Sequence, residues 1–378
     1  MGRWRQNKEF VVALPGSECY KRGVTVTIVG LKPVIITNEN KDTVMNIRSR
    51  LEVMEHLCPW LEEKMETLLR PVEALWQPTD FLPDMARESG HDELVALQKE
   101  AAALPDDVLS VLVGDTVTEE ALPTYAYWLA CIEGISEAGA APRSPWAVWN
   151  RAWCAEENRH GDVLSRYLVL SGRVNMREVD VVINNLIYDG MDIQTGRDPY
   201  RFFVYTSFQE LATNRSHRNV GNLAKSVGAE TLTKMSGVIA GDEGWHARAY
   251  RTFVEKFLEI DTDEAVLAIA DLFKKQIKMP AMNMREAGVE RGVTFKVFEA
   301  LAQRIKVYTA QDYLEILAFL VDHWKIPALT GLSTEAEKAQ EFICGLPDRY
   351  RKLLARTRIP TAEELPATFR WLTPAVAG

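Results

Sequence analysis

One predicted helix carries a glutamate and a histidine at positions where its pattern calls for core residues. The helix is expected to begin after the N-cap Ser144, with Pro145 at its first position, and to end at Gly172. Glu157 and His160 fall on its apolar stripe, in steps of three or four residues. The other members of the stripe are Trp146, Trp149, Trp153, Leu164 and Tyr167.

A second segment, residues 231–257, repeats this arrangement with Glu243 and His246. Its stripe is otherwise apolar or aromatic and consists of Leu232, Met235, Ile239, Tyr250, Phe253 and Phe257. An unpartnered buried carboxylate costs several kcal/mol. The two segments therefore predict helices whose buried faces share a bound ligand, which would compensate the cost of burying the two carboxylates.

Chance does not account for both pairs on matched stripes. With 6 His and 53 acidic residues in 378, roughly one acid-x-x-His pair is expected at random. The third such pair, Glu88 and His91, lies in a polar stretch around Ser89 and Gly90 without an apolar stripe. We interpret that pair as accidental.

Two further glutamates complete a repeated pattern. Glu119 precedes Glu157 by 38 residues and Glu210 precedes Glu243 by 33 residues, so each lies one helix before its Glu-x-x-His pair. Four antiparallel helices carrying these residues would bring four carboxylates and two imidazoles together. That is the ligand set of a carboxylate-bridged di-iron or di-manganese site. Proteins with such a site could store iron, form a radical or oxidise a hydrocarbon, and the pattern alone does not choose among these functions.

Composition bounds the remaining possibilities. A net charge of -9 argues against a nucleic-acid binder, and no apolar run reaches the 18 residues of a membrane span. The five cysteines lack the spacing of a disulfide framework or a zinc site. Residues 22–37 are rich in Val, Ile and Thr and could pair as strands, whereas the pattern beyond about residue 47 is helical.

The simplest division is a divergent segment, residues 1–45, followed by one all-helical domain, residues 46–378. More than a hundred residues follow the second Glu-x-x-His pair. We expect them to form a substrate channel or a dimer interface, because oxidation of inert C–H bonds needs a dry, shaped cavity beside the metals.

Several stretches resemble the soluble plant-type acyl-acyl carrier protein desaturases. They are VGDTVTEEALPTY, WCAEENRHGDVLSRYLVLSGRV, YTSFQELAT, KMPA and LTGLS, and the similarity runs from about residue 50 to 350. The resemblance implies an all-α, ferritin-like di-iron bundle with additional helices, forming a homodimer in the plastid stroma. It implies an enzyme that uses O2 and reduced ferredoxin to place a cis double bond, usually at carbon 9, in a saturated chain, most often stearoyl, on acyl carrier protein.

The resemblance also assigns roles by position. Two irons would be held by Glu119, Glu157, His160, Glu210, Glu243 and His246, with Glu157 and Glu243 as bridges. Thr213 matches the family's hydroxyl beside the oxygen site. Asp242 and Trp76 match a proposed electron route to His160.

This chain departs from the family at two kinds of position. Gly244 and Trp245 replace two basic residues that could face acyl carrier protein or ferredoxin, and a helical Gly costs about 1 kcal/mol relative to Ala. Trp128, Phe202 and Phe203 are bulky where the channel is expected, which favours a shorter chain or another position of attack. The alternatives are therefore such a divergent desaturase, another kind of di-iron protein, or a non-catalytic bundle that binds partners or lipid.

Overall fold

Helices make up nearly all of the regular structure in the computed structural model, which describes residues 50–135 and 144–372. Within these ranges no strand occurs, and one isolated antiparallel bridge joins Val174 to Leu372. The all-α prediction is confirmed, while the strand pair predicted for residues 22–37 lies outside the described residues. The α-helices are α2 (Cys58–Leu68), α3 (Gly90–Ala102), α4 (Asp106–Glu120), α5 (Leu122–Cys131), α6 (Pro145–Ser171), α7 (Met176–Asp189), α8 (Pro199–Ser226), α9 (Glu230–Ile260), α10 (Thr262–Lys275), α11 (Val293–Arg304), α12 (Ala310–His323), α13 (Thr334–Cys344) and α14 (Leu346–Leu354).

Local signals in the sequence place the ends of the long helices. Ser144 caps α6 by accepting a hydrogen bond from the Ala147 amide, and α6 ends at Gly172, which has a φ of 66°. Asp198 caps α8 in the same way. The boundaries predicted for the first Glu-x-x-His helix are therefore confirmed. A hydroxyl N-cap is a strong local signal for the start of a helix, and a left-handed glycine is one for its end.

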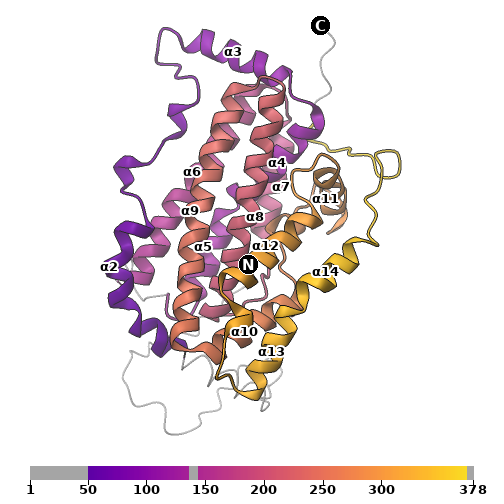
Figure 1. Ribbon diagram of the computed structural model, residues 1–378. Coiled ribbons are helices and arrows are strands. Elements are labelled where there is room, and N and C mark those ends of the chain that lie inside the picture. The colour runs from indigo at the N-terminus through magenta and orange to yellow at the C-terminus, as the bar shows by residue number, and fades with distance from the viewer. Residues whose placement is uncertain (1–49, 136–143, 373–378) are drawn as a thin grey trace, which may run out of the picture. The chain divides into compact units, whose positions relative to one another are not determined.

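The four long helices α4, α6, α8 and α9 lie side by side and form the centre of the domain (Figure 1). The hairpin of α8 and α9, joined by residues 227–229, has the most extensive packing, and α4 packs against both α6 and α8. All apolar stripe residues predicted for α6 and α9 are buried. The polar members of those stripes therefore meet inside the bundle.

The remaining helices cover this bundle. Helices α10 to α14 form the C-terminal part, where α10 packs on α8, α9 and α13, and α12 packs on α8 and α14 (Figure 1). Short 3-10 turns connect several of these elements: η1 (Val72–Ala74), η2 (Pro78–Asp80), η3 (Pro280–Asn283) and η4 (Ile326–Ala328). The described residues belong to one compact unit, Met45–Gly378. The predicted division at residue 45 lies in the part that is not described and stays a prediction.

None of the helices in the described ranges is both long enough and apolar enough to cross a membrane. The third pair, Glu88 and His91, is exposed and lies outside the two candidate metal-ligand groups found among the described residues.

Candidate metal centre

Six buried side chains converge between α4, α6, α8 and α9 in two overlapping groups. Within each group the ligand-type atoms all lie within 4.8 Å of one another. The first group consists of Glu119, Glu157, His160 and Glu243, and the second of Glu157, Glu210, Glu243 and His246. The structure brings together all six residues that were predicted to share a site, and two glutamates belong to both groups.

The two imidazoles face the shared glutamates through their Nδ1 atoms. His160 Nδ1 lies 3.3 Å from Glu157 Oε2 and 3.3 Å from Glu243 Oε1. His246 Nδ1 lies 2.7 Å from Glu157 Oε1 and 3.6 Å from Glu210 Oε2. Both histidines therefore direct the same ring nitrogen towards the centre of the cluster.

The polar atoms of this cluster fit a pair of divalent cations. Four of them make no hydrogen bond within the described residues, although all are buried: Glu157 Oε1, His160 Nδ1, Glu210 Oε2 and His246 Nδ1. The short approach of His246 to Glu157 lacks hydrogen-bond geometry. Because buried polar atoms are nearly always paired, inward-facing imidazole nitrogens and carboxylate oxygens without partners suit metal ligation.

Electrostatics point the same way. Burial, together with the neighbouring Glu243 and Glu157 charges, raises the pKa of Glu210 well above its usual value. Burial also raises the pKa of Glu119 to about 7, against an opposing hydrogen bond from His217. Without a cation, simultaneous ionisation of Glu210 and Glu119 is unfavourable, because both are buried close to other carboxylates. Two divalent cations would compensate these negative charges.

Each ligand histidine has a carboxylate on its outer nitrogen. His160 Nε2 lies 3.3 Å from Asp242 Oδ2, and His246 Nε2 lies 2.9 Å from Glu156 Oε2. Each of these acids immediately precedes a shared glutamate, and each binds the histidine of the opposite helix. An ionised carboxylate can only accept, so it keeps a proton on Nε2 and fixes the ring orientation.

The other glutamates also have defined partners. The Glu119 carboxylate lies 2.9 Å from His217 Nε2, and Trp153 donates its indole N–H to Glu210 at 3.2 Å. Thr213 Oγ1 donates to Glu243 Oε2 at 2.7 Å. The predicted Thr213 therefore contacts a shared glutamate.

The outer side of His160 is covered by a tryptophan and two arginines. Trp76 stacks on the His160 ring at 6.0 Å between centroids and donates to Asp242 at 2.8 Å. Arg159 donates to Asp242 at 3.1 Å and lies over the Trp76 ring. Burial opposes ionisation of Asp242, but its bonds and charge contacts with His160 and Arg70 lower its pKa to about 2. The predicted Trp76 and Asp242 are thus in direct contact with each other and with His160.

A glycine allows the two ligand helices to approach each other. Gly161 follows His160 on α6, and a Cβ atom there would lie 3.2 Å from the Glu119 carbonyl oxygen on α4. That distance is tighter than ordinary van der Waals contact, so a larger residue would push α4 away. Gly161 therefore sets the separation of Glu119 from His160.

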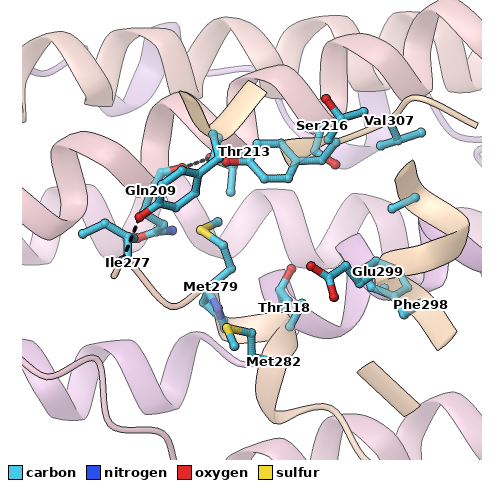
Figure 2. A pocket seen from close by; sticks show the side chains of 18 of the residues that line it. Thr118, Gln209, Thr213, Ser216, Ile277, Met279, Met282, Phe298, Glu299 and Val307 are labelled. Atoms are coloured by element: carbon cyan, nitrogen blue, oxygen red, sulfur yellow. Dashed lines mark hydrogen bonds between the residues drawn. The ribbon is translucent and has the colours of Figure 1, made fainter. Parts of the chain in front are cut away.

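An apolar cavity of about 470 Å³ reaches the cluster from the surface. At its inner end it is lined by Glu119, Glu157 and Thr213, and near the surface by Met282 and Leu353, which are 38% and 55% exposed. Figure 2 shows side chains of α8, such as Gln209, Thr213 and Ser216, together with Ile277, Met279, Phe298 and Val307 around this space. A long apolar chain could thus reach the cluster from outside.

The three bulky residues predicted to narrow the channel do not line this cavity. Phe202 and Phe203 are buried in the core, and Trp128 donates its indole N–H to the Met191 carbonyl. Phe203 packs on Tyr250, which packs on the lining residue Trp153. The prediction that they form the channel wall is wrong for this cavity, which Phe203 reaches only through Tyr250 and Trp153.

Known proteins with similar sequences were identified over most of the chain. The family model described as "Fatty acid desaturase" matches residues 49–373. This chain belongs to the fatty acid desaturase family. It is 49% identical to stearoyl-[acyl-carrier-protein] 9-desaturase of Spinacia oleracea over 326 residues, which cover 86% of this chain and 81% of that protein.

One further relative is about as similar to this desaturase, and one solved structure is more distant. Stearoyl-[acyl-carrier-protein] 9-desaturase 5 of Arabidopsis thaliana is 49% identical over 82% of this chain and 78% of its own length. A solved structure described as a candidate acyl-ACP desaturase, DesA2 of Mycobacterium tuberculosis H37Rv, has a TM-score of 0.48 at 18% identity. It covers 76% of this chain and 99% of its own.

Several residues around the candidate metal centre of this desaturase were not predicted from its sequence. Glu156 could have been found, since it precedes Glu157 as Asp242 precedes Glu243. His217 also had a signal, because it lies seven residues after Glu210, two turns along the same helix face. No feature of the sequence indicated Arg70, because it lies just beyond the end of α2 and its contacts depend on how that helix packs.

Metal binding by this desaturase is expected to weaken in acid. Glu119 has a raised pKa of about 7, and a ligand must lose its proton to bind a cation. Below that pH the proton competes with the metal, so affinity should fall about tenfold per pH unit for each displaced proton. Cobalt(II) titrations followed by absorbance on both sides of neutrality test this, and an affinity that stays constant or rises in acid would contradict it.

Proposed function

We propose that this protein is an acyl-[acyl-carrier-protein] desaturase that introduces a cis double bond into a saturated chain with two iron ions, O2 and reduced ferredoxin. The observation that carries the proposal is the apolar cavity, which ends at two glutamates of a buried dimetal ligand set. Its relatives from Spinacia oleracea and Arabidopsis thaliana are named stearoyl-[acyl-carrier-protein] 9-desaturases. These names support a stearoyl chain and attack at carbon 9.

The overall reaction balances with O2 as the oxidant. Two adjacent methylenes lose two hydrogen atoms, ferredoxin supplies two electrons, and with two protons from solvent O2 leaves as two waters. The chemistry that two bound irons supply is activation of O2 for attack on an inert C–H bond. Glu157 and Glu243 would hold both ions, since each belongs to both ligand groups.

The chain's own residues position the substrate and exclude water. The apolar wall of the cavity keeps an alkyl chain extended and water away from the site. The Thr213 hydroxyl lies between the cavity and the Glu243 carboxylate, to which it donates. We propose that it orients Glu243 and presents its oxygen to the O2 side of the site.

We further propose that electrons reach His160 through Trp76 and Asp242. The stacking of Trp76 on His160 and its hydrogen bond to Asp242 support this route. The resemblance to the plant-type family supports a homodimer. Chloroplastic relatives support a plastid location.

The direct test is turnover of acyl carrier protein loaded with myristoyl, palmitoyl or stearoyl chains, using reduced ferredoxin and ferrous iron. We expect a monounsaturated product, with the double bond located by mass spectrometry. A preference for a shorter chain, or a double bond at another carbon, would contradict the assignment of stearoyl and carbon 9 but would still support a desaturase reaction. Failure of an iron-loaded, reduced sample on all three chains would overturn the proposed reaction and favour a non-catalytic bundle.

Gly114 is expected to be essential to the shape of the cavity. A Cβ atom there would lie 2.1 Å from Cε2 of the Phe298 ring, and both residues line the cavity. Gly114→Ala should therefore displace the ring and destabilise the protein by about 1–3 kcal/mol through overpacking.

The matched control for this variant is Gly237→Ala. Gly237 lies in α9, and a Cβ atom at this position would have no neighbour within 4 Å beyond its own helix backbone. Alanine should therefore stabilise the helix by about 0.5–1 kcal/mol. Urea unfolding of both variants measures the difference. If both substitutions changed the free energy of unfolding equally, the position of the Phe298 ring would not depend on the absence of a side chain at Gly114.

A further inference from the structure

Arg70 lies where the outer partners of both ligand histidines meet. Its guanidinium donates to the Asp242 carboxylate, and the same Nη2 atom lies 3.8 Å from Glu156 Oε2. Its backbone amide lies 3.5 Å from Glu156 Oε1. Asp242 accepts from His160 and Glu156 accepts from His246, so one cation touches the supports of both metal positions.

We propose that Arg70 is a positioning residue that joins the two halves of the metal centre through Asp242 and Glu156, and that Trp245 holds it in place. This inference rests on the proposed dimetal site. It concerns how the two ligand histidines are oriented, which neither the family match nor the sequence pattern addresses.

The Trp245 side chain explains how Arg70 is held. Its indole N–H donates to the Leu68 carbonyl at 2.7 Å, at the end of α2. The Arg70 guanidinium lies over the indole at 5.6 Å, and Arg248 covers the same ring at 3.9 Å. Arg248 also donates to the Thr67 carbonyl. Trp245 thus ties the end of α2, and with it Arg70, to α9.

Arg70 and its neighbour Arg159 differ in the carboxylates that they contact. Arg159 donates to Asp242 and to the Trp76 carbonyl, and no hydrogen bond between Arg159 and Glu156 occurs in the described ranges. The Arg70 side chain is 31% exposed, and the residue lies two positions beyond the end of α2. Substituting it should perturb the site more than the fold. Arg159 is therefore a matched control that contacts one of the two supports.

The test uses the full chain loaded with cobalt(II), and its readout is the proton NMR signal of each histidine Nε2–H, shifted by the metal. Arg70→Gln should shift both signals and lower cobalt affinity about 10- to 100-fold, the usual effect of losing an outer partner. Arg159→Gln should shift the His160 signal more than the His246 signal, because its hydrogen bond is to Asp242. Trp245→Leu should reproduce the Arg70→Gln pattern more weakly.

The outcomes separate this inference from the proposed function. If wild type binds cobalt and Arg70→Gln leaves the His246 signal and the affinity unchanged, Arg70 does not join the two halves. A rise in affinity on losing Arg70 would also overturn the inference, because it would mean that the arginine acts only as a repelling charge. Failure of wild type to bind cobalt would overturn the metal centre itself. Circular dichroism of each variant shows that it is folded.

Discussion

Glu243→Gln will abolish binding of both metal ions, whereas Glu210→Gln will abolish binding at one position. Glu243 belongs to both ligand groups, and Glu210 belongs only to the group that contains His246. Gln keeps the size of the side chain and removes its charge, so the difference reports the number of metals each carboxylate serves. Glu157→Gln should behave like Glu243→Gln, and Glu119→Gln like Glu210→Gln.

The measurement is metal stoichiometry after reconstitution with ferrous iron or cobalt(II), together with turnover on an acyl carrier substrate. Wild type should hold about two ions per chain, as sites of this ligand set do. We expect near zero for the two shared positions and about one for the other two. The exposed Glu88, replaced in the same way, is the control for loss of charge alone. Equal losses in all four ligand variants would contradict the assignment of shared carboxylates.

Removal of the metals will destabilise the folded protein more than any single substitution outside the core. The six candidate ligands come from four different helices, so the site exists only in the folded state. Ligand binding to the native state alone stabilises by about 4 kcal/mol when its free concentration is 1,000 times Kd. Two sites should therefore give a large upward shift of the unfolding transition on metal loading.

Urea or thermal unfolding of chelated and reloaded samples measures this effect. Glu243→Gln is the control, because it should not respond to added metal. Identical unfolding curves for chelated and reloaded wild type would show that the cluster holds no metal.

The parts of the fold that were predicted correctly depend on local signals. The limits of α6 follow from Ser144, Pro145 and Gly172, whose conformational preferences act within one helical turn. The buried faces of α6 and α9 follow from residue periodicity alone. The convergence of six ligand-type residues was predictable for the same reason, because a polar residue on an apolar stripe must meet another element that compensates it.

Other features depended on contacts between distant segments. Phe202 and Phe203 were expected to line the channel, but their distance from it depends on Tyr250 and Trp153. Gly161 could be recognised as important only once α4 was seen against it. No spacing in the chain indicates such contacts, since periodicity gives the buried face of a helix and not its neighbour.

The amino-acid sequence was sufficient to predict the helical fold of the described residues and the six Glu and His side chains that converge in it, because helix caps, stripes and the repeated Glu-x-x-His pattern are local properties. The family resemblance already linked Asp242 to His160, whereas only the tertiary structure showed that Glu156 supports His246. Asp242 serves the histidine of α6 and Glu156 that of α9, a crossing that exists only when the two helices face each other. The tertiary structure also decided the place of Arg70, whose charge reaches both acids only because α2 ends beside Trp245.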